Sequence, residues 1–204
     1  MDALNIFEEV MDDEAESITL AKNFIIHNED SYLKIVDRIL SLKGHLIFMG
    51  VGKSGHIGEK LAATFASTGT PSFFVHATES MHGDLGMITR QDLVVMISNS
   101  GETKEALAPI APIHAIGADV IGITKNIESS LAKDADYVLV VPVNGEADQF
   151  NLAPTKSSTA VLAVGDALAL TISELKDFSE RDFAMFHPGG ALGKRLLKEG
   201  VLKG

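Results

Sequence analysis

The sequence predicts an α/β protein: a three-layer α/β/α sandwich on a five-stranded parallel sheet, preceded by N-terminal helices. Five short apolar runs have the length and composition of strands that are buried on both faces. Segments with helical spacing separate these runs, and this alternation is typical of a parallel sheet covered by helices. The chain has 204 residues, 46% of them hydrophobic, which is enough to bury a core between the layers.

Residues 1–42 predict two helices. In the first helix, apolar residues recur at roughly helical spacing, at Leu4, Phe7, Met11, Ile18, Ala21 and Ile25. Seven acidic side chains among residues 2–16 suit a solvated face and a favourable helix start. Ser31 is expected to cap the second helix, which carries the apolar residues Ile35, Val36, Ile39 and Leu40.

Residues 43–204 are expected to form the α/β core and the C-terminal helices. The strands are predicted at 45–50, 72–75, 92–98, 119–124 and 137–143. The helices are predicted at 55–68, 102–116 and 129–134, and a long one rich in alanine and leucine at 157–176. We expect residues 1–204 to form one domain, because the sequence shows no internal repeat, low-complexity tract or linker.

Composition excludes several classes of function. Seventeen basic residues stand against 28 acidic ones, and a net charge of −11 disfavours binding to nucleic acid. The absence of cysteine excludes disulfides, thiolate nucleophiles and cysteine-based metal sites. The sequence has neither an uninterrupted apolar run of membrane-spanning length nor a signal peptide, so a soluble cytoplasmic protein is expected.

The loop after the first expected strand reads G-V-G-K-S-G-H over residues 50–56. It satisfies G-x-G-x-x-G between a strand and a helix, so a dinucleotide site is a competing interpretation. Against that interpretation, no acidic residue ends the second expected strand to hold a ribose hydroxyl. A P-loop is excluded because its first glycine would fall at Ile47. The loop is either a tight turn or a ligand site offering backbone amides, the Ser54 hydroxyl and the Lys53 cation.

The loop after the third expected strand reads S-N-S-G-E-T over residues 98–103. Hydroxyl groups and free amides at the start of a helix can hold a phosphate without net positive charge. The alternative is an ordinary helix cap, since serine and threonine are favoured there. Glu105 follows just inside the expected helix, near the same edge of the sheet.

Three of the seven histidines lie in segments that could carry chemistry. His76 and His82 flank a turn after the second expected strand, and His187 opens a glycine-rich segment. The others are expected to be structural or surface residues, namely His27, His45, His56 and His114. No metal-ligand spacing such as H-E-x-x-H is present, so no metal is required.

Three segments together resemble the sugar isomerase (SIS) domain of the D-arabinose 5-phosphate isomerases. They are GVGKSGHIGEKLAATFASTGTPSFFVHATESMHGDLGMI, VVMISNSGET and FHPGGALGKRLL. The resemblance runs from about residue 5 to residue 198. The resemblance implies a flavodoxin-like fold. It also implies that the chain interconverts D-ribulose 5-phosphate and D-arabinose 5-phosphate through an enediolate and needs no cofactor. In this family the product feeds Kdo synthesis for lipopolysaccharide or capsule.

The chain departs from this family in two ways. Many relatives carry two CBS domains after the SIS domain, and none is expected in these 204 residues. The loop at 146–154 lacks the usual cysteine–proline pair, which bears on the choice among sugar phosphates.

Residue by residue, the resemblance implies a set of site residues. Those important for catalysis would be Lys53, His82, Glu105, Glu146 and His187. Those that contact substrate would be Ser54, Gly69, Thr70, His82, Ser98, Asn99, Ser100, Gly101 and Thr103. His76 would be able to capture inhibitory zinc.

Isomerisation needs a phosphate anchor, a base that moves a proton between C1 and C2, and a proton shuttle for the sugar oxygens. We assign the 98–103 loop as anchor, Glu105 as base and His187 as shuttle. Lys53 would supply electrostatic support and His82 would orient the sugar hydroxyls. Glu105 and Glu146 can exchange roles, because the sequence contains no distances.

Three functions stay open. The chain is an arabinose 5-phosphate isomerase, or a sensor that binds a sugar phosphate without turnover, or an SIS isomerase that acts on another sugar phosphate. A homo-oligomer is expected, most simply a tetramer built as a dimer of dimers. His187 then completes either its own site or the site of a neighbouring subunit.

Overall fold

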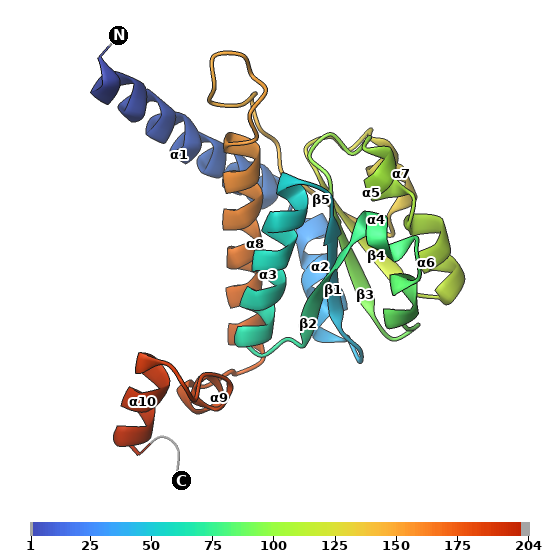
Figure 1. Ribbon diagram of the computed structural model, residues 1–204, viewed down its shortest axis with the longest axis vertical. Coiled ribbons are helices and arrows are strands. Elements are labelled where there is room, and N and C mark those ends of the chain that lie inside the picture. Colours follow the sequence, from blue (N-terminus) through green and yellow to red (C-terminus); the bar gives the residue numbers. More distant parts are fainter. Residues whose placement is uncertain (1, 201–204) are drawn as a thin grey trace.

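The computed structural model describes residues 2–200, apart from the side chains of residues 191 and 192. Residue 1 and residues 201–204 of the expected domain lie outside the described residues. Five parallel strands form one sheet in the order β2-β1-β3-β4-β5 (Figure 1). They are β1 (Leu46–Gly50), β2 (Ser72–His76), β3 (Leu93–Ile97), β4 (Asp119–Thr124) and β5 (Tyr137–Val140). The sequence prediction of a five-stranded parallel α/β sandwich is confirmed.

The strands in the middle of the sheet are buried on both faces. Every residue of β1 and β3 is buried, as their continuous apolar sequences require. Along β1 the side chains alternate between two cores, with Phe48 in one and Met49 in the other. The outer strand β2 is only half-buried at most positions, because it has a neighbour on one side alone.

Helices cover both faces of the sheet, and most expected helices are present. One face packs against α1 (Ala3–His27), α2 (Glu29–Leu40), α3 (Lys53–Ser67) and α8 (Lys156–Leu175). The other face packs against the shorter helices α5 (Lys104–Leu107), α6 (Ile110–Ile116) and α7 (Ser130–Asp134). A short helix, α4 (Ala77–Ser80), and a 3-10 turn, η1 (Asp84–Met87), follow β2.

Two local expectations were wrong. The helix expected over 102–116 is divided into α5 and α6, because Pro109 has no N–H to continue the helical hydrogen bonds. Ser31 does not begin the second helix: α2 starts at Glu29, and the Ser31 N–H donates to the carbonyl of Asn28 (3.3 Å). The chain turns at Asn28, whose side-chain amide donates to the carbonyl of Phe24.

The helix α8 is long and apolar enough to cross a membrane when judged by length and composition alone. Its most apolar window has a mean hydropathy of 1.4, and 39% of that window is buried. Ala160, Leu168 and Ile172 pack into the core, where α8 contacts α1 and α3. Burial within the protein therefore accounts for part of the apolar surface of α8.

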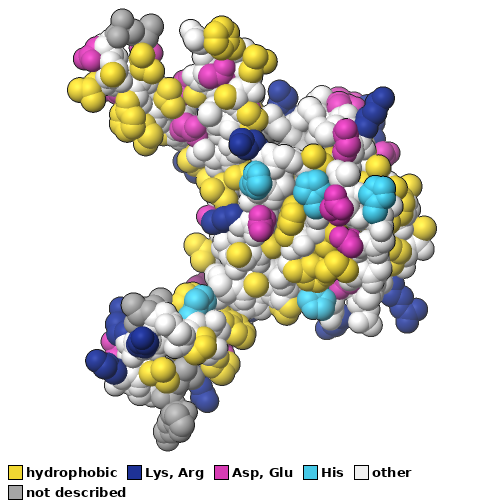
Figure 2. All heavy atoms as spheres, in the orientation of Figure 1, with side chains coloured by type: hydrophobic (Ala, Val, Ile, Leu, Met, Phe, Trp, Pro, Cys, Tyr) yellow, Lys and Arg dark blue, Asp and Glu magenta, His cyan; other side chains and the backbone are white. Residues whose placement is uncertain are grey.

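Two segments project from the sandwich (Figure 1). The N-terminal half of α1 extends beyond the sheet and exposes hydrophobic side chains, which Figure 2 shows gathered there. At the opposite end, α9 (Glu180–Phe186) and α10 (Ala191–Lys198) form an arm beyond the C-terminal end of α8. Ser179 and Asp182 form a capping box that begins α9. The two projections leave apolar surface at both ends of the molecule.

Candidate functional site

The carboxyl ends of β1 and β3 meet at the point where the strand order reverses. From β1 the chain continues to β2 on one side of the sheet, whereas β3 lies on the other side. The loops that follow β1 and β3 therefore diverge and leave a crevice, where ligands bind in open α/β sheets.

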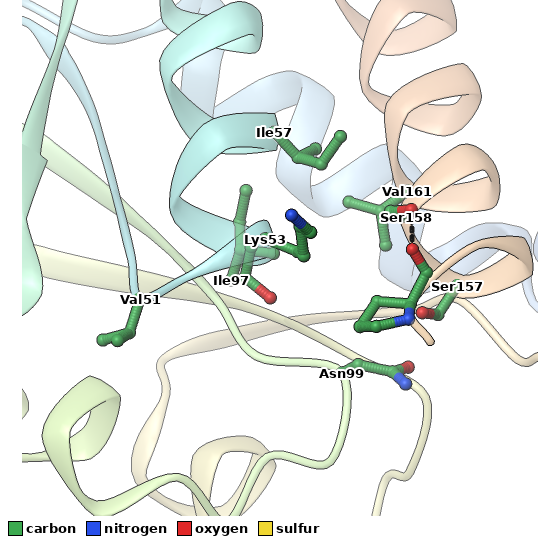
Figure 3. A pocket seen from close by; sticks show the side chains of 10 residues that line it. Val51, Lys53, Ile57, Ile97, Asn99, Ser157, Ser158 and Val161 are labelled. Atoms are coloured by element: carbon green, nitrogen blue, oxygen red, sulfur yellow. Dashed lines mark hydrogen bonds between the residues drawn. The ribbon is translucent and has the colours of Figure 1, made fainter. Parts of the chain in front are cut away.

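Two adjoining cavities occupy this crevice. The smaller cavity, about 180 Å³, lies between α3, β3 and the start of α8 (Figure 3), and Lys53, Asn99 and Ser157 help to line it. The larger cavity, about 430 Å³, has a mostly polar lining from the 98–103 loop, the β4–α7 loop and residues 143–154. Ser54, Asn99 and Pro154 line both cavities, which thus form one continuous site.

The 98–103 loop holds its shape by internal hydrogen bonds. The Gly101 N–H donates to the Ser98 hydroxyl (3.2 Å), and the Glu102 N–H donates to the Ser100 hydroxyl (3.2 Å). Gly101 has φ +69°, and a Cβ there would lie 2.3 Å from Oγ of Ser129, so glycine is required. Among residues 2–200, the N–H groups of Asn99, Ser100 and Thr103 have no hydrogen-bond acceptor. The loop thus presents free amides and hydroxyls, as a phosphate cradle must.

A second loop fixes the 98–103 loop in place. The Glu102 carboxylate accepts hydrogen bonds from the N–H (2.9 Å) and the hydroxyl (2.7 Å) of Ser130. These two hydrogen bonds, and the one from the N–H most of all, hold the pKa of the Glu102 carboxyl below its usual range. The Leu131 N–H donates to the carbonyl of Gly101 (3.0 Å). The first residues of α7 therefore help to hold the cradle in its shape.

Glu146 lines the larger cavity and also caps α8. Its Oε2 accepts from the N–H groups of Thr155 (2.9 Å) and Ser157 (3.1 Å), and its Oε1 accepts from the Ser157 hydroxyl. The Thr155 hydroxyl also lies 3.4 Å from Oε2, and Asn151 Oδ1 accepts the N–H of Glu146. The positive end of the α8 dipole and these donors hold the carboxylate at the cavity wall.

Lys53 is the first residue of α3 and extends between α3 and the start of α8 (Figure 3). It follows Gly52, whose φ of +59° turns the chain sharply after β1. Within the described part of the chain, no carboxylate oxygen lies within 4 Å of its amine. Lys53 is thus available to an anionic ligand.

Other expected site residues follow strands at the same edge of the sheet but do not line these cavities. Glu105 is exposed on α5, and His82 is exposed between α4 and η1. His76 is half-buried at the end of β2, where its Nδ1 accepts the Thr78 N–H (3.3 Å). Its expected capture of zinc remains a prediction.

Three expected site residues lie at the opposite end of the molecule. Gly69 and Thr70 follow the C-terminus of α3, whereas Lys53 begins it, and a helix of 15 residues is about 22 Å long. Thr70 is buried, and its hydroxyl accepts a hydrogen bond from the Lys176 amine (2.9 Å). His187 lies beyond the C-terminus of α8 and stacks on Phe183, with ring centroids 3.8 Å apart. One chain therefore does not bring all the expected residues around one small sugar phosphate.

The structure adds site residues that the sequence analysis missed. Lys125 and Asn151 line the larger cavity, and Ser157 lines the smaller one. Lys125 was detectable, because it directly follows the fourth strand at its carboxyl end. Asn151 and Ser157 carried no such signal, since the fold of residues 144–156 brings them to the crevice. Within residues 2–200, no group of three or more His, Asp and Glu side chains converges as a metal site would require.

Comparison with known proteins places this site in a context. Residues 39–171 match the SIS domain family. The chain is 51% identical to the arabinose 5-phosphate isomerase KpsF of Escherichia coli over 166 residues, which cover 81% of this chain and 52% of that protein. It is 51% identical to the arabinose 5-phosphate isomerase KdsD of Pseudomonas aeruginosa over 168 residues, covering 82% and 52%. The chain thus spans about half the length of the curated relatives it matches.

Two solved structures are similar throughout. A protein of E. coli CFT073 in complex with arabinose 5-phosphate is 46% identical, with a TM-score of 0.87, covering 92% of this chain and 100% of that one. A putative phosphosugar isomerase of Bacteroides fragilis, described as involved in capsule formation, is 33% identical with a TM-score of 0.85, covering 93% and 99%.

Proposed function

Because the chain belongs to the SIS domain family, we propose that it is an arabinose 5-phosphate isomerase. It interconverts D-ribulose 5-phosphate and D-arabinose 5-phosphate through an enediolate. The observation that carries this proposal is the junction of an ordered phosphate cradle at 98–103 with a positioned carboxylate, Glu146, in one cavity. Relatives that are about 50% identical and bear this activity in their names support it.

The chain's own groups supply the three requirements of the reaction. The free amides and hydroxyls of the 98–103 loop bind the phosphate, so that its binding energy holds the reacting carbons in place. A carboxylate removes the proton from the carbon next to the carbonyl and returns it to the neighbouring carbon. Lys53 stabilises the negative oxygen of the enediolate, and His82 orients the sugar hydroxyls. His187 moves the proton between O1 and O2.

The position of the two acids favours Glu146 as the base. Its carboxylate lines the larger cavity, whereas Glu105 is exposed on α5 and lines neither cavity within one chain. Hydrogen bonds from α8 fix Glu146, and a base must have a fixed position relative to the carbon it deprotonates. Glu105 is the alternative base, should a second subunit bring substrate to the outer side of α5.

We propose further that the complete site forms between two copies of the chain. Gly69 and His187 lie at the end of the molecule away from the cradle, so a neighbouring copy would supply them in trans, whereas Thr70 is buried beside Gly69 and would hold that segment in place. The projecting half of α1 exposes Leu4 (73%) and Phe7 (64%), which such an association would cover. The expected assembly is a homotetramer built as a dimer of dimers.

Complementation tests the shared site. Lys53→Ala and His187→Ala are each expected to inactivate the enzyme. If His187 acts in trans, random re-pairing of the two variants leaves one intact site in each mixed dimer, and up to about a quarter of the sites recover. Mixtures that stay inactive despite proven subunit exchange would place His187 in its own chain's site.

The cellular role follows from the same proposal. We propose a soluble cytoplasmic enzyme that supplies arabinose 5-phosphate for Kdo synthesis, binding neither nucleic acid nor membrane. The net charge of −11 supports the first of these exclusions, and the packing of α8 in the core supports the second.

The deciding experiment follows ketose and aldose phosphates by NMR in the presence of the protein and no added cofactor. Interconversion of the two pentose phosphates, undiminished after EDTA treatment, is the expected result. Turnover of a different sugar phosphate would identify another isomerase of this family. Binding without any turnover would identify a sensor, and either result would reject the proposal.

A further inference from the structure

We propose that Lys125 is a phosphate-binding residue of this site, supplying a second cation beside the one from Lys53. The identity of the substrate rests on the proposed function, whereas the binding of phosphate by Lys125 does not. The inference starts from the cavity itself. Lys125 lines the larger cavity together with the Ser98, Ser100 and Thr103 of the cradle.

The backbone of Lys125 has a fixed position relative to the cradle. Its N–H donates to the carbonyl of Asn99 (3.1 Å), and the Thr124 hydroxyl reaches the same carbonyl (3.2 Å). At the start of α7, which follows this loop, Ser130 and Leu131 bind Glu102 and Gly101. The loop that carries Lys125 is thus joined to the cradle at several points, and its side chain begins from a defined place at the cavity wall.

The charge of Lys125 is available to a ligand. Among the described residues, no carboxylate oxygen lies within 4 Å of its amine, whereas Lys133 on the following helix pairs with Glu128 (3.7 Å). The nearby Glu102 carboxylate is occupied by Ser130. Lys125 and Glu146 are the charged residues of the cavity lining, and hydrogen bonds from α8 already compensate Glu146.

A phosphate ligand has a physical need for this second cation. The protein carries a net charge of −11, so a phosphate dianion is repelled as it approaches. Amides and hydroxyls give direction to the oxygens of a phosphate but neutralise little of its charge. Lys53 reaches the site from the side of the smaller cavity and Lys125 from the side of the larger one, across Ser54 and Asn99. Two point charges on different sides of the cradle would balance a dianion between them.

The test uses inorganic phosphate as the probe, in the full chain, with three variants. Lys125→Met removes the charge, Lys125→Arg keeps it, and Lys133→Met removes a lysine close in sequence that does not line the cavity. Phosphate binding is measured by calorimetry, and KM and kcat are measured wherever turnover is found. Melting temperatures of all variants establish that each is folded.

For Lys125→Met we expect the Kd of phosphate and the KM to rise about tenfold, as for a charge-assisted hydrogen bond to a phosphate at a partly exposed site. The kcat should stay within about twofold, since the contact is the same in ground and transition states. Lys125→Arg and Lys133→Met should bind phosphate as the wild type does. Added salt should reduce the difference between Lys125→Met and wild type.

Two outcomes would overturn the proposal. One is wild-type phosphate affinity in folded Lys125→Met, and the other is equal loss of affinity in Lys125→Arg and Lys125→Met, which would show that the charge is not what binds. Calorimetry decides both even if no sugar phosphate is turned over. A failure of the proposed isomerase activity is therefore distinguishable from a failure of this inference.

Discussion

Glu146→Gln tests the base and the cap of α8 at once. The carboxylate accepts from two backbone N–H groups and from the hydroxyls of Thr155 and Ser157. An amide of the same shape keeps one oxygen but turns an NH₂ group toward donors. The loss of these charge-assisted bonds at a helix N-terminus should lower the free energy of unfolding by about 1–2 kcal/mol. For a domain of this size that corresponds to a fall in Tm of roughly 2–8 °C.

The effect on turnover should be much larger than the effect on stability. If Glu146 is the base, kcat should fall by about 10²–10⁴, the usual contribution of a general base. KM should change by less than about threefold, because the phosphate cradle is intact. The assay is steady-state conversion of ribulose 5-phosphate followed by NMR, alongside thermal unfolding of the same samples.

Asp92→Asn is the matched control for stability. Asp92 is a buried carboxylate at the amino end of the sheet that accepts from the His45 N–H (2.6 Å) and from Thr89, far from both cavities. It should lower Tm at least as much as Glu146→Gln and leave kcat unchanged. A folded Glu146→Gln enzyme with kcat within about threefold of wild type would refute our assignment of the base. A large loss in Glu105→Gln instead would then place the base there.

Three further predictions concern stability and ligand affinity. Burial alone would raise the pKa of Asp92, but hydrogen bonds from His45 and Thr89 outweigh it and lower the pKa, so this group stabilises the fold above its unfolded pKa of about 3.9. That stability should be lost as the pH falls from about 5 through the lowered folded-state pKa, and denaturant titrations should show a smaller acid loss in Asp92→Asn than in wild type. Glu102→Gln weakens the hydrogen bonds from Ser130 that hold the 98–103 loop, so KM should rise by about three- to tenfold while kcat changes little. Equal KM values for this variant and the wild type would mean that the loop keeps its shape without the carboxylate. Gly165→Ala places a Cβ 2.5 Å from both Leu61 methyl groups, so it should lower the free energy of unfolding by about 1–3 kcal/mol, measured by thermal unfolding. Gly86→Ala has open space around the new Cβ and should lower the free energy of unfolding much less. Equal losses of stability in the two variants would contradict the packing argument.

The layer structure was predictable because each strand comes from a short apolar run. Such a run is typical of a strand in a parallel sheet that helices cover on both faces. The order of the strands was not, because pairing is decided by contacts between segments that are distant in the sequence. The division of the helix at Pro109 is a local effect of proline, and the sequence already contained that signal. At Asn28, by contrast, the helix boundary follows the junction of α1 and α2 and not the serine that suits a cap.

The cradle was predictable for a similar reason. Loops at the carboxyl ends of parallel strands meet at one edge of the sheet, so Ser54 and the 98–103 loop had to lie near each other. Sequence patterns gave no means of placing Gly69 and His187 relative to that edge. The lengths of α3 and α8 in the folded chain show which end of the molecule each residue occupies. The second role of Glu146, as the cap of α8, depends on a loop whose path no local pattern predicts.

The hydrogen bond from the Lys125 N–H to the Asn99 carbonyl continues the pairing of β3 and β4 past the end of the sheet, and the Leu131 N–H at the start of α7 holds the Gly101 carbonyl. The ligand site therefore shares the stiffness of the sheet, and it is sensitive to the core beneath it. A Cβ at Gly122 of β4 would lie 3.0 Å from Cγ of Leu131, so a side chain there would push on the residue that holds Gly101. Substitutions of buried aliphatic residues that never touch the ligand can thus change its affinity. Evolution can adjust ligand binding through this part of the core as well as through the loops that line the cavity.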